Sequence, residues 1–131
     1  MVRTFAGKDC NEITLNALRI MTGFLMMPHG AQKLFGALGR EAVPLASLPG
    51  VAGVLEFFGG LAILLGFYTR PVAFVLSGLM AAAYWLAHGT KAFWPILNQG
   101  ELAALYCFVF LYLAAKGGGD WSIDGCMGKK G

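Results

Sequence analysis

The stretch GVLEFFGGLAILLGFYTR, residues Gly53–Arg70, decides the fold of this chain. It is almost entirely apolar, and its length suits a membrane-spanning helix, which needs about 20 residues to cross a hydrocarbon core of about 30 Å. It nevertheless contains one carboxylate, Glu56, near its start. Because a charge inside a bilayer is costly, we expect Glu56 to face protein and to have a polar partner there.

The composition of the whole chain agrees with a membrane protein. Of the 131 residues, 57% are hydrophobic and only 13% are charged, whereas soluble domains have about 25% charged residues. A single domain of this size could not bury so much apolar surface in water. The net charge of +3 comes from scattered Lys and Arg residues, so nucleic acid is not an expected partner. The N-terminus lacks the pattern of a cleaved signal peptide.

Four apolar segments predict an all-α fold, an integral membrane up-down bundle of four transmembrane helices. The predicted spans are about residues 13–35, 50–67, 71–89 and 99–115. Short connections between successive spans favour antiparallel neighbours. Pro28 is expected to kink and interrupt the first span, and the glycine-rich tail, residues 116–131, is expected to be irregular.

Glycines are expected to let the helices approach one another closely, because lipid supplies no hydrophobic drive between helices. The glycines that we expect to have this role are Gly53, Gly59, Gly60, Gly66 and Gly78.

The distribution of basic residues predicts the orientation. With four spans, one side of the membrane receives Arg3, Lys8, Arg70, Lys116, Lys129 and Lys130, and the other receives Lys33, Arg40 and Lys91. The positive-inside rule then places both termini and the tail in the cytoplasm.

This orientation places ionisable residues from all four spans at one depth, in the outer third of the membrane. The residues are His29, Lys33, Glu56, His88 and Glu101. By helical periodicity Glu56 shares a face with Gly53 and Gly60, and Glu101 shares one with Leu105, Phe108 and Tyr112. We expect all five ionisable side chains to point inward.

One interpretation of this cluster is a site for a quinone headgroup. A quinone needs hydrogen-bond donors to its carbonyl oxygens and groups that exchange protons. In this hypothesis Glu56 and His29 exchange protons as the catalytic pair, while Lys33 and His88 donate hydrogen bonds. Tyr84 would flank the ring, and Glu101 would connect the site to the outer aqueous phase.

Two other interpretations of the cluster stay open. A metal could bind to its His and Glu side chains, but the paired Glu-x-x-His motifs of di-iron bundles are missing from the sequence, so we predict no metal ligands. The cluster could also be purely structural, with Glu56 paired to Lys33 and His88 bonded to Glu101 to fix the helix register.

A second polar group lies toward the other side of the membrane. Arg19 lies about two turns inside the first span, deep enough to need a partner, and Asp120 or Asp124 could fold back onto it. Arg70 and Lys116 lie near the surface, where they can orient the chain and contact lipid headgroups.

Several motifs together resemble the DoxX family of small bacterial membrane proteins. They are LRIMTGFLMMPHGAQKLFG, GVLEFFGGLAILLGFYTRPVA, LAHG and NQGELAALYCFVFLYLAAKGGGDWSID, and they cover nearly the whole chain in order. The positions that the family pattern marks are Arg19, His29, Gly30, Lys33, Glu56, Gly59, Gly60, Thr69, Arg70, His88, Glu101 and Asp124.

The resemblance implies a four-helix protein of the bacterial cytoplasmic (inner) membrane that is linked to redox chemistry, similar to the small subunit of a thiosulfate:quinone oxidoreductase. It also adds Arg19 to the expected cofactor-binding residues. The sequence has no haem, flavin or iron–sulfur motif. We therefore predict a quinone-interacting subunit of a redox system. The alternatives are a non-catalytic accessory subunit that packs against a larger membrane complex and a small-molecule or lipid carrier.

Overall fold

The structure, a computed structural model, describes residues 4–128 apart from residues 6, 38 and 40. Its longer helices are α1 (Cys10–Phe35), α2 (Leu48–Leu65), α3 (Thr69–Ala83), which continues into the π-helix η1 (Tyr84–His88), and α5 (Glu101–Lys116). The short elements are α4 (Pro95–Asn98), α6 (Ile123–Cys126) and the antiparallel strands β1 (Thr4–Phe5) and β2 (Lys8–Asp9). The predicted all-helical class is confirmed, with a two-residue strand pair before α1. Arg3, Arg40, Lys129 and Lys130, which entered the charge count, lie outside the described residues.

Local sequence signals explain where α1 and α2 begin and end. The Asp9 side chain accepts a hydrogen bond from the N–H of Asn11 at the start of α1, and Ser47 caps α2 in the same way. Both helices end at a glycine with positive φ, which is the usual helix terminator. The predicted interruption at Pro28 is wrong, since α1 continues through this proline to Phe35.

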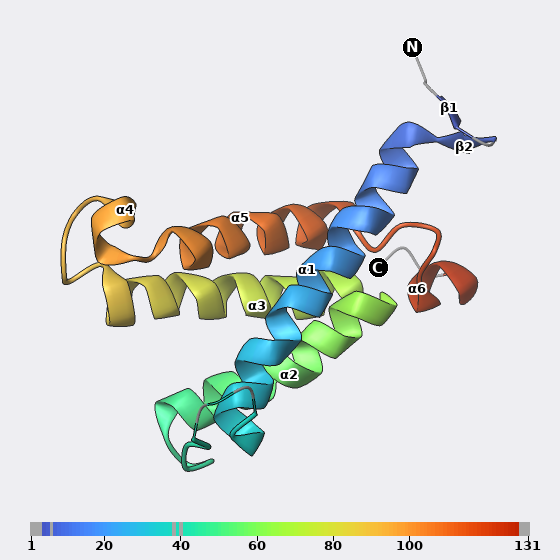
Figure 1. Cartoon of the computed structure of the whole chain (residues 1–131). Coiled ribbons are helices and arrows are strands. Elements are labelled where there is room, and N and C mark those ends of the chain that lie inside the picture. Colours follow the sequence, from blue (N-terminus) through green and yellow to red (C-terminus); the bar gives the residue numbers. More distant parts are fainter. Residues whose placement is uncertain (1–3, 6, 38, 40, 129–131) are drawn as a thin grey trace.

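The helices form two antiparallel pairs that cross obliquely (Figure 1). α1 packs along α2, and α3 packs along α5, while contacts between α1 and α5 are few. The prediction of antiparallel neighbours holds within each pair. The four axes nevertheless do not lie together as the near-parallel bundle that short connections suggested.

Glycines explain why α1 and α2 lie so close. A Cβ on Gly23 would lie 2.5 Å from the backbone nitrogen of Leu64, and one on Gly30 would lie 2.4 Å from that of Phe57. Either would clash with the backbone of α2, so these positions need glycine. The prediction for Gly78 is wrong, because a Cβ there would meet open space.

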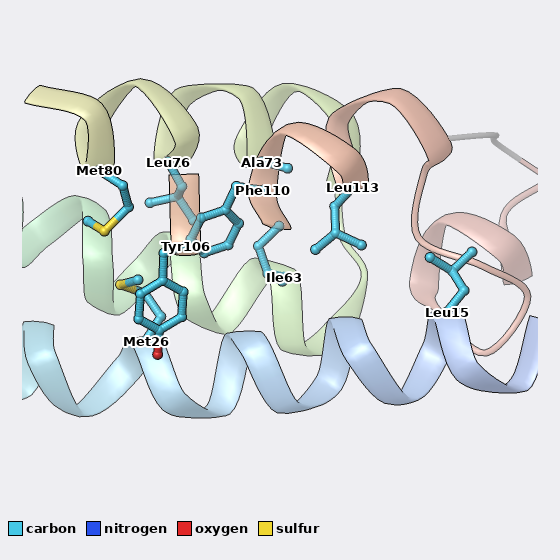
Figure 2. Packing of buried hydrophobic residues seen from close by; sticks show 9 residues of the cluster. All are labelled: Leu15, Met26, Ile63, Ala73, Leu76, Met80, Tyr106, Phe110 and Leu113. Atoms are coloured by element: carbon cyan, nitrogen blue, oxygen red, sulfur yellow. The ribbon is translucent and has the colours of Figure 1, made fainter. Parts of the chain in front are cut away.

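The hydrophobic core lies between the two pairs (Figure 2). Its members are Leu15, Met26, Ile63, Ala73, Leu76, Met80, Tyr106, Phe110 and Leu113. Large apolar side chains such as Phe58, Phe74 and Phe108 face outward instead, which is the arrangement expected of a surface covered by lipid. Two helical segments, Leu48–Leu65 and Thr69–His88, are long and apolar enough to cross a membrane.

Candidate functional site

A cavity of about 270 Å³ lies at one end of the helix pairs. Residues from all four long helices line it: Met26, His29, Lys33, Glu56, Met80, Ala83, His88, Gln99, Leu102, Ala103 and Tyr106. We call this end of the molecule the Glu56 end, and the opposite end, where the tail folds back, the Arg19 end. The fold therefore brings together four of the predicted site residues, namely His29, Lys33, Glu56 and His88.

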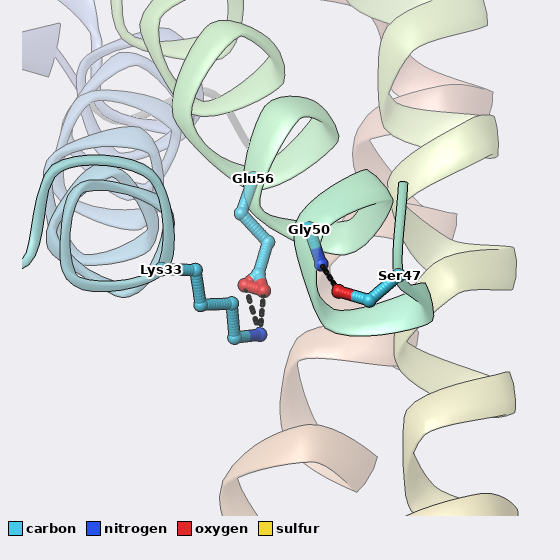
Figure 3. Close-up of polar contacts among 4 residues, drawn as sticks. All are labelled: Lys33, Ser47, Gly50 and Glu56. Carbon is cyan, nitrogen blue, oxygen red and sulfur yellow. Dashed lines mark hydrogen bonds and ion pairs between the residues drawn. The ribbon is translucent and has the colours of Figure 1, made fainter. Parts of the chain in front are cut away.

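Lys33 and Glu56 form an ion pair on the wall of this cavity (Figure 3). The Lys33 ammonium donates hydrogen bonds to both carboxylate oxygens, at 2.9 Å to Oε2. Glu56 is only 2% exposed, whereas the Lys33 side chain is 27% exposed. Gly53 permits the pairing, since a Cβ there would lie 2.8 Å from the Cβ of Lys33. The partner expected for the buried carboxylate is thus a lysine of the neighbouring helix.

His29 and Tyr106 form a second part of the lining. The His29 ring meets Tyr106 edge to face, with centroids 6.3 Å apart. Tyr106 is buried and stacks on Phe110, and its hydroxyl points toward α1 (Figure 2). Sequence analysis missed Tyr106. The spacing of Tyr106, Phe110 and Leu113 along one helical face is only a partial signal for it, because the opposite face of α5 is apolar as well.

The expectation that Glu101 points inward is wrong. Glu101 is exposed, as are Leu105, Phe108 and Tyr112, which share its face of α5. Its side chain lines a separate surface groove with Pro95. Both faces of α5 are apolar, so periodicity alone could not tell which one packs against protein.

His88 lies in η1, a single π-helical turn at the end of α3. Such turns are frequent at functional sites. Its Nδ1 lies 3.0 Å from the main-chain carbonyl oxygen of Asn98, so the suggested bond to Glu101 is wrong. Tyr84 is outside the cavity lining, and its hydroxyl accepts a hydrogen bond from Nδ2 of Asn98 at 3.0 Å. Asn98, which sequence analysis missed, therefore connects both predicted residues.

Arg19 lies outside the cavity lining. It precedes Lys33 by 14 positions on α1 and Met26, the first lining residue of that helix, by seven, which corresponds to about 20 Å and about 10 Å along a helix. The buried guanidinium donates to the carbonyl oxygens of Ile63, Leu64 and Trp121, at 3.3, 3.0 and 2.7 Å. Because the carbonyls of Ile63 and Leu64 belong to the last turn of α2, the guanidinium lies where the helix dipole favours a positive charge. The structure therefore does not bring Arg19 together with the other predicted binding residues.

The tail is mostly irregular, as expected, apart from the short helix α6, and it folds back onto the Arg19 end. The Asp124 carboxylate accepts hydrogen bonds from the N–H groups of Tyr68 and Thr69, both at 2.8 Å. It thereby caps the start of α3, where negative charge is favourable. Asp120 accepts from the Asn16 side chain at 2.9 Å. The predicted fold-back of the tail is present, but the partners differ from those expected. Arg19 donates to carbonyl oxygens of the tail and of α2, and Asp124 accepts from the first N–H groups of α3.

Within the described residues, no group of three His, Cys, Asp or Glu side chains is placed to hold a metal ion. The side chains that line the cavity offer one ammonium, one carboxylate, two imidazoles, one phenol and the amide of Gln99 between apolar walls.

Comparisons with known proteins agree with this description. The family model described as DoxX matches residues 14–89. An uncharacterized protein of Haemophilus influenzae is 37% identical over 86% of this chain and 90% of its own length. The inner membrane protein YqjF of Escherichia coli is 32% identical over 94% and 98%. An uncharacterized membrane protein of Mycobacterium tuberculosis is 25% identical over 86% and 80%. No solved structure matches the chain significantly.

Together with the two apolar helices, these matches confirm the predicted localisation, the bacterial inner membrane, with more than one helix able to span it.

Proposed function

The chain belongs to the DoxX family, and on this basis we propose that it is an inner-membrane subunit of a redox system that binds a quinone headgroup in the cavity at the Glu56 end. The observation that carries the proposal is the convergence of His29, Lys33, Glu56 and His88 from separate helices on one cavity. Ionisable residues inside membrane helices are functional candidates by default.

The lining fits such a headgroup in size and chemistry. Ligand pockets generally measure about 300–1,000 Å³ and combine apolar walls with a few convergent polar groups. A cavity of about 270 Å³ is near the lower limit, which suits a single ring better than a larger molecule. Met26 and Met80 supply apolar wall, and Tyr106 supplies an aromatic one.

In this proposal the side chains of the cavity hold the ring and move protons. When bound, a quinone supplies redox chemistry that couples electrons to protons. Lys33 donates hydrogen bonds, and its long, partly exposed side chain lets the ammonium reach toward a ligand while Glu56 stays in place. Glu56 and His29 exchange protons. Because the sequence has no haem, flavin or iron–sulfur motif, a partner redox protein in the membrane would exchange the electrons.

Quinone binding by the purified protein tests the proposal. We expect Glu56→Gln and His29→Ala each to weaken binding of a short-chain benzoquinone several-fold, because each removes a proton-exchanging group from the cavity. Glu101→Gln is the matched control for Glu56→Gln, since Glu101 is exposed and outside the cavity. Unchanged binding in both cavity variants would contradict the proposal.

The proposal includes four membrane spans, with both termini and the Arg19 end in the cytoplasm. Native Cys10 and Cys126 lie at that end of the chain and Cys126 is exposed, so a membrane-impermeant maleimide should label Cys126 in inside-out vesicles but not in intact spheroplasts. Ala46→Cys, placed in the exposed loop before α2 of a cysteine-free chain, should show the opposite pattern. Labelling of Cys126 in spheroplasts would overturn the orientation.

One observation favours the second candidate, a non-catalytic accessory subunit of a larger membrane complex. The Glu56 carboxylate already has a partner in Lys33, and such a pair can serve to fix the register of two helices. In that case Glu56→Gln should lower thermal stability, and no quinone should bind to the wild-type protein.

A further inference from the structure

We propose that the cavity recognises the reduced, hydroxyl-bearing form of its ring ligand through the unprotonated Nε2 of His88, and that Asn98 is the positioning residue that sets this state. The inference rests on the proposed quinone site and names the form of the ligand that the site prefers. It also reverses the predicted role of His88 from hydrogen-bond donor to acceptor.

The contact between His88 and Asn98 determines which ring nitrogen carries the proton. Nδ1 of His88 lies 3.0 Å from the main-chain carbonyl oxygen of Asn98. A carbonyl oxygen can only accept, so Nδ1 must carry the hydrogen. In the neutral ring Nε2 is then a bare acceptor. His88 lines the cavity, and Nε2 is the nitrogen left to meet a ligand.

Asn98 is held firmly enough to impose this arrangement. It is 1% exposed, and its Nδ2 donates to the Tyr84 hydroxyl and to the carbonyl of Ala92, both at 3.0 Å. Its Oδ1 accepts from the N–H of Gly100 at 2.7 Å. The side chain thus ties the loop before α5 to η1 and fixes the carbonyl that His88 meets. Asn98 acts on the ligand only through His88.

The other polar groups of the cavity add acceptors more than donors. The Glu56 carboxylate accepts only, and it has lone pairs beyond the two that the Lys33 ammonium uses. The ammonium has two of its three hydrogens directed to Glu56. Tyr106, His29 and Gln99 can each donate or accept. A ligand that donates hydrogen bonds, such as an aromatic diol, therefore complements the wall better than one with two carbonyl oxygens.

Nitrogen NMR tests the role of Asn98 without any ligand. The chain has only two histidines, so ¹⁵N-histidine labelling of the His29→Ala protein in lipid nanodiscs reports on His88 alone. We expect the neutral ring to be protonated at Nδ1 and bare at Nε2. Asn98→Asp and the milder Tyr84→Phe should both increase the fraction protonated at Nε2, since the first removes the bond to the Ala92 carbonyl and the second the bond to the Tyr84 hydroxyl. Leu97→Ala, next to Asn98 with its side chain exposed and outside the cavity lining, is the control and should change nothing.

Two NMR results would overturn the assignment of Asn98. One is a wild-type His88 protonated at Nε2. The other is a ring state that stays unchanged in both Tyr84→Phe and Asn98→Asp, each checked for folding by its circular dichroism spectrum. Because Tyr84→Phe removes a single hydroxyl, it keeps the test decisive if Asn98→Asp does not fold.

Binding of the two redox forms of one short-chain benzoquinone tests the preference itself. Measured anaerobically on the wild-type protein, the reduced form should bind about tenfold more tightly, the effect of one net hydrogen bond. Tyr84→Phe should reduce this ratio. Equal or tighter binding of the oxidised form would overturn this inference and leave the proposed function standing, whereas binding of neither form would overturn the proposed function.

Discussion

At the Arg19 end, a buried guanidinium meets carbonyl oxygens of α2 and of the tail, whereas at the Glu56 end a buried carboxylate meets one lysine beside a cavity. The first charge is enclosed by main-chain groups that cannot move away without unfolding the segment. The second has a flexible partner that is partly exposed. We therefore call the Arg19 end closed, because its buried charge is enclosed by the chain, and the Glu56 end open, because its buried charge faces a cavity.

Comparing Arg19 with Glu56 shows how a structural buried charge can be distinguished from a candidate functional one in this fold. Both Arg19 and Glu56 are buried ionisable residues within apolar helices. Because such residues are rare in membrane helices, both are candidates for a functional role on that ground alone. What distinguishes them is whether the polar neighbours leave room for another molecule. At the Arg19 end the guanidinium is covered by main-chain carbonyls and lies outside the lining of the neighbouring pocket of about 440 Å³, whereas at the Glu56 end the carboxylate itself lines a cavity.

The largest expected effect is the loss of stability in Arg19→Met. Removing the guanidinium leaves the carbonyls of Ile63, Leu64 and Trp121 without this donor in a buried site. We expect the free energy of unfolding to fall by about 3–5 kcal/mol, because each buried carbonyl that loses its donor costs about 1–3 kcal/mol. Thermal unfolding in detergent measures it. Arg70→Met, at an exposed position of the same end, is the control, and an equal loss there would remove the distinction between the two arginines.

The next largest loss of stability is expected from a change between α1 and α2, the helices that contribute Lys33 and Glu56 to the open end. Gly30→Ala places a Cβ 2.4 Å from the backbone nitrogen of Phe57 and 2.6 Å from the carbonyl oxygen of Gly53. Because backbone atoms cannot rotate away, we expect a loss of about 3 kcal/mol. Gly78→Ala meets open space and should be neutral or slightly stabilising. Equal thermal stability of the two variants would contradict the close approach of α1 and α2.

A smaller loss is expected when a carboxylate at the closed end becomes an amide. Asp124→Asn keeps the shape but leaves one oxygen in place of two, so one of the N–H groups of Tyr68 and Thr69 loses its acceptor. We expect about 2 kcal/mol of destabilisation. Hydrogen exchange at these two amides, followed by NMR, should show the loss directly. Unchanged protection of both would indicate that the tail does not cap α3 as described.

The smallest effect on stability is expected for the corresponding change at the open end. Glu56→Gln leaves Lys33 without its partner, but the lysine is partly exposed and can extend its ammonium toward water. We expect a loss of about 1 kcal/mol, measured by the same thermal unfolding as for Asp124→Asn. A loss larger than that of Asp124→Asn would reverse the comparison and favour a purely structural role for the Lys33–Glu56 pair.

The buried carboxylate shows how far sequence reasoning reached. Because a carboxylate is costly to place in lipid, we predicted a polar partner for Glu56. The positions of Lys33 and His29 along the first predicted span placed them at the same membrane depth. The structure has the ion pair and brings His88 to the same cavity. These residues were predictable because a carboxylate in an apolar helix has few ways to be satisfied.

Glu101 and Tyr106 show where the sequence could not decide. α5 has apolar residues on every face, so helical periodicity gave no direction. The helix turns Tyr106 and Phe110 inward because they fill the space between the two pairs, and Glu101 consequently faces outward. Asn98 was missed for a related reason, since a loop asparagine has no sequence signal for its hydrogen-bond partners.

The membrane class, the positions of the long helices within a few residues, and the identity of the residues that are costly to bury could all be predicted from the amino-acid sequence. These follow from local composition and from the price of charge in an apolar medium. The oblique crossing of the pairs, the return of the tail onto Arg19 and the contact of His88 with the main-chain carbonyl of Asn98 came from the tertiary structure alone. Each of these depends on contacts between side chains and carbonyls of segments that are far apart in the chain. Packing, not local composition, determines such contacts.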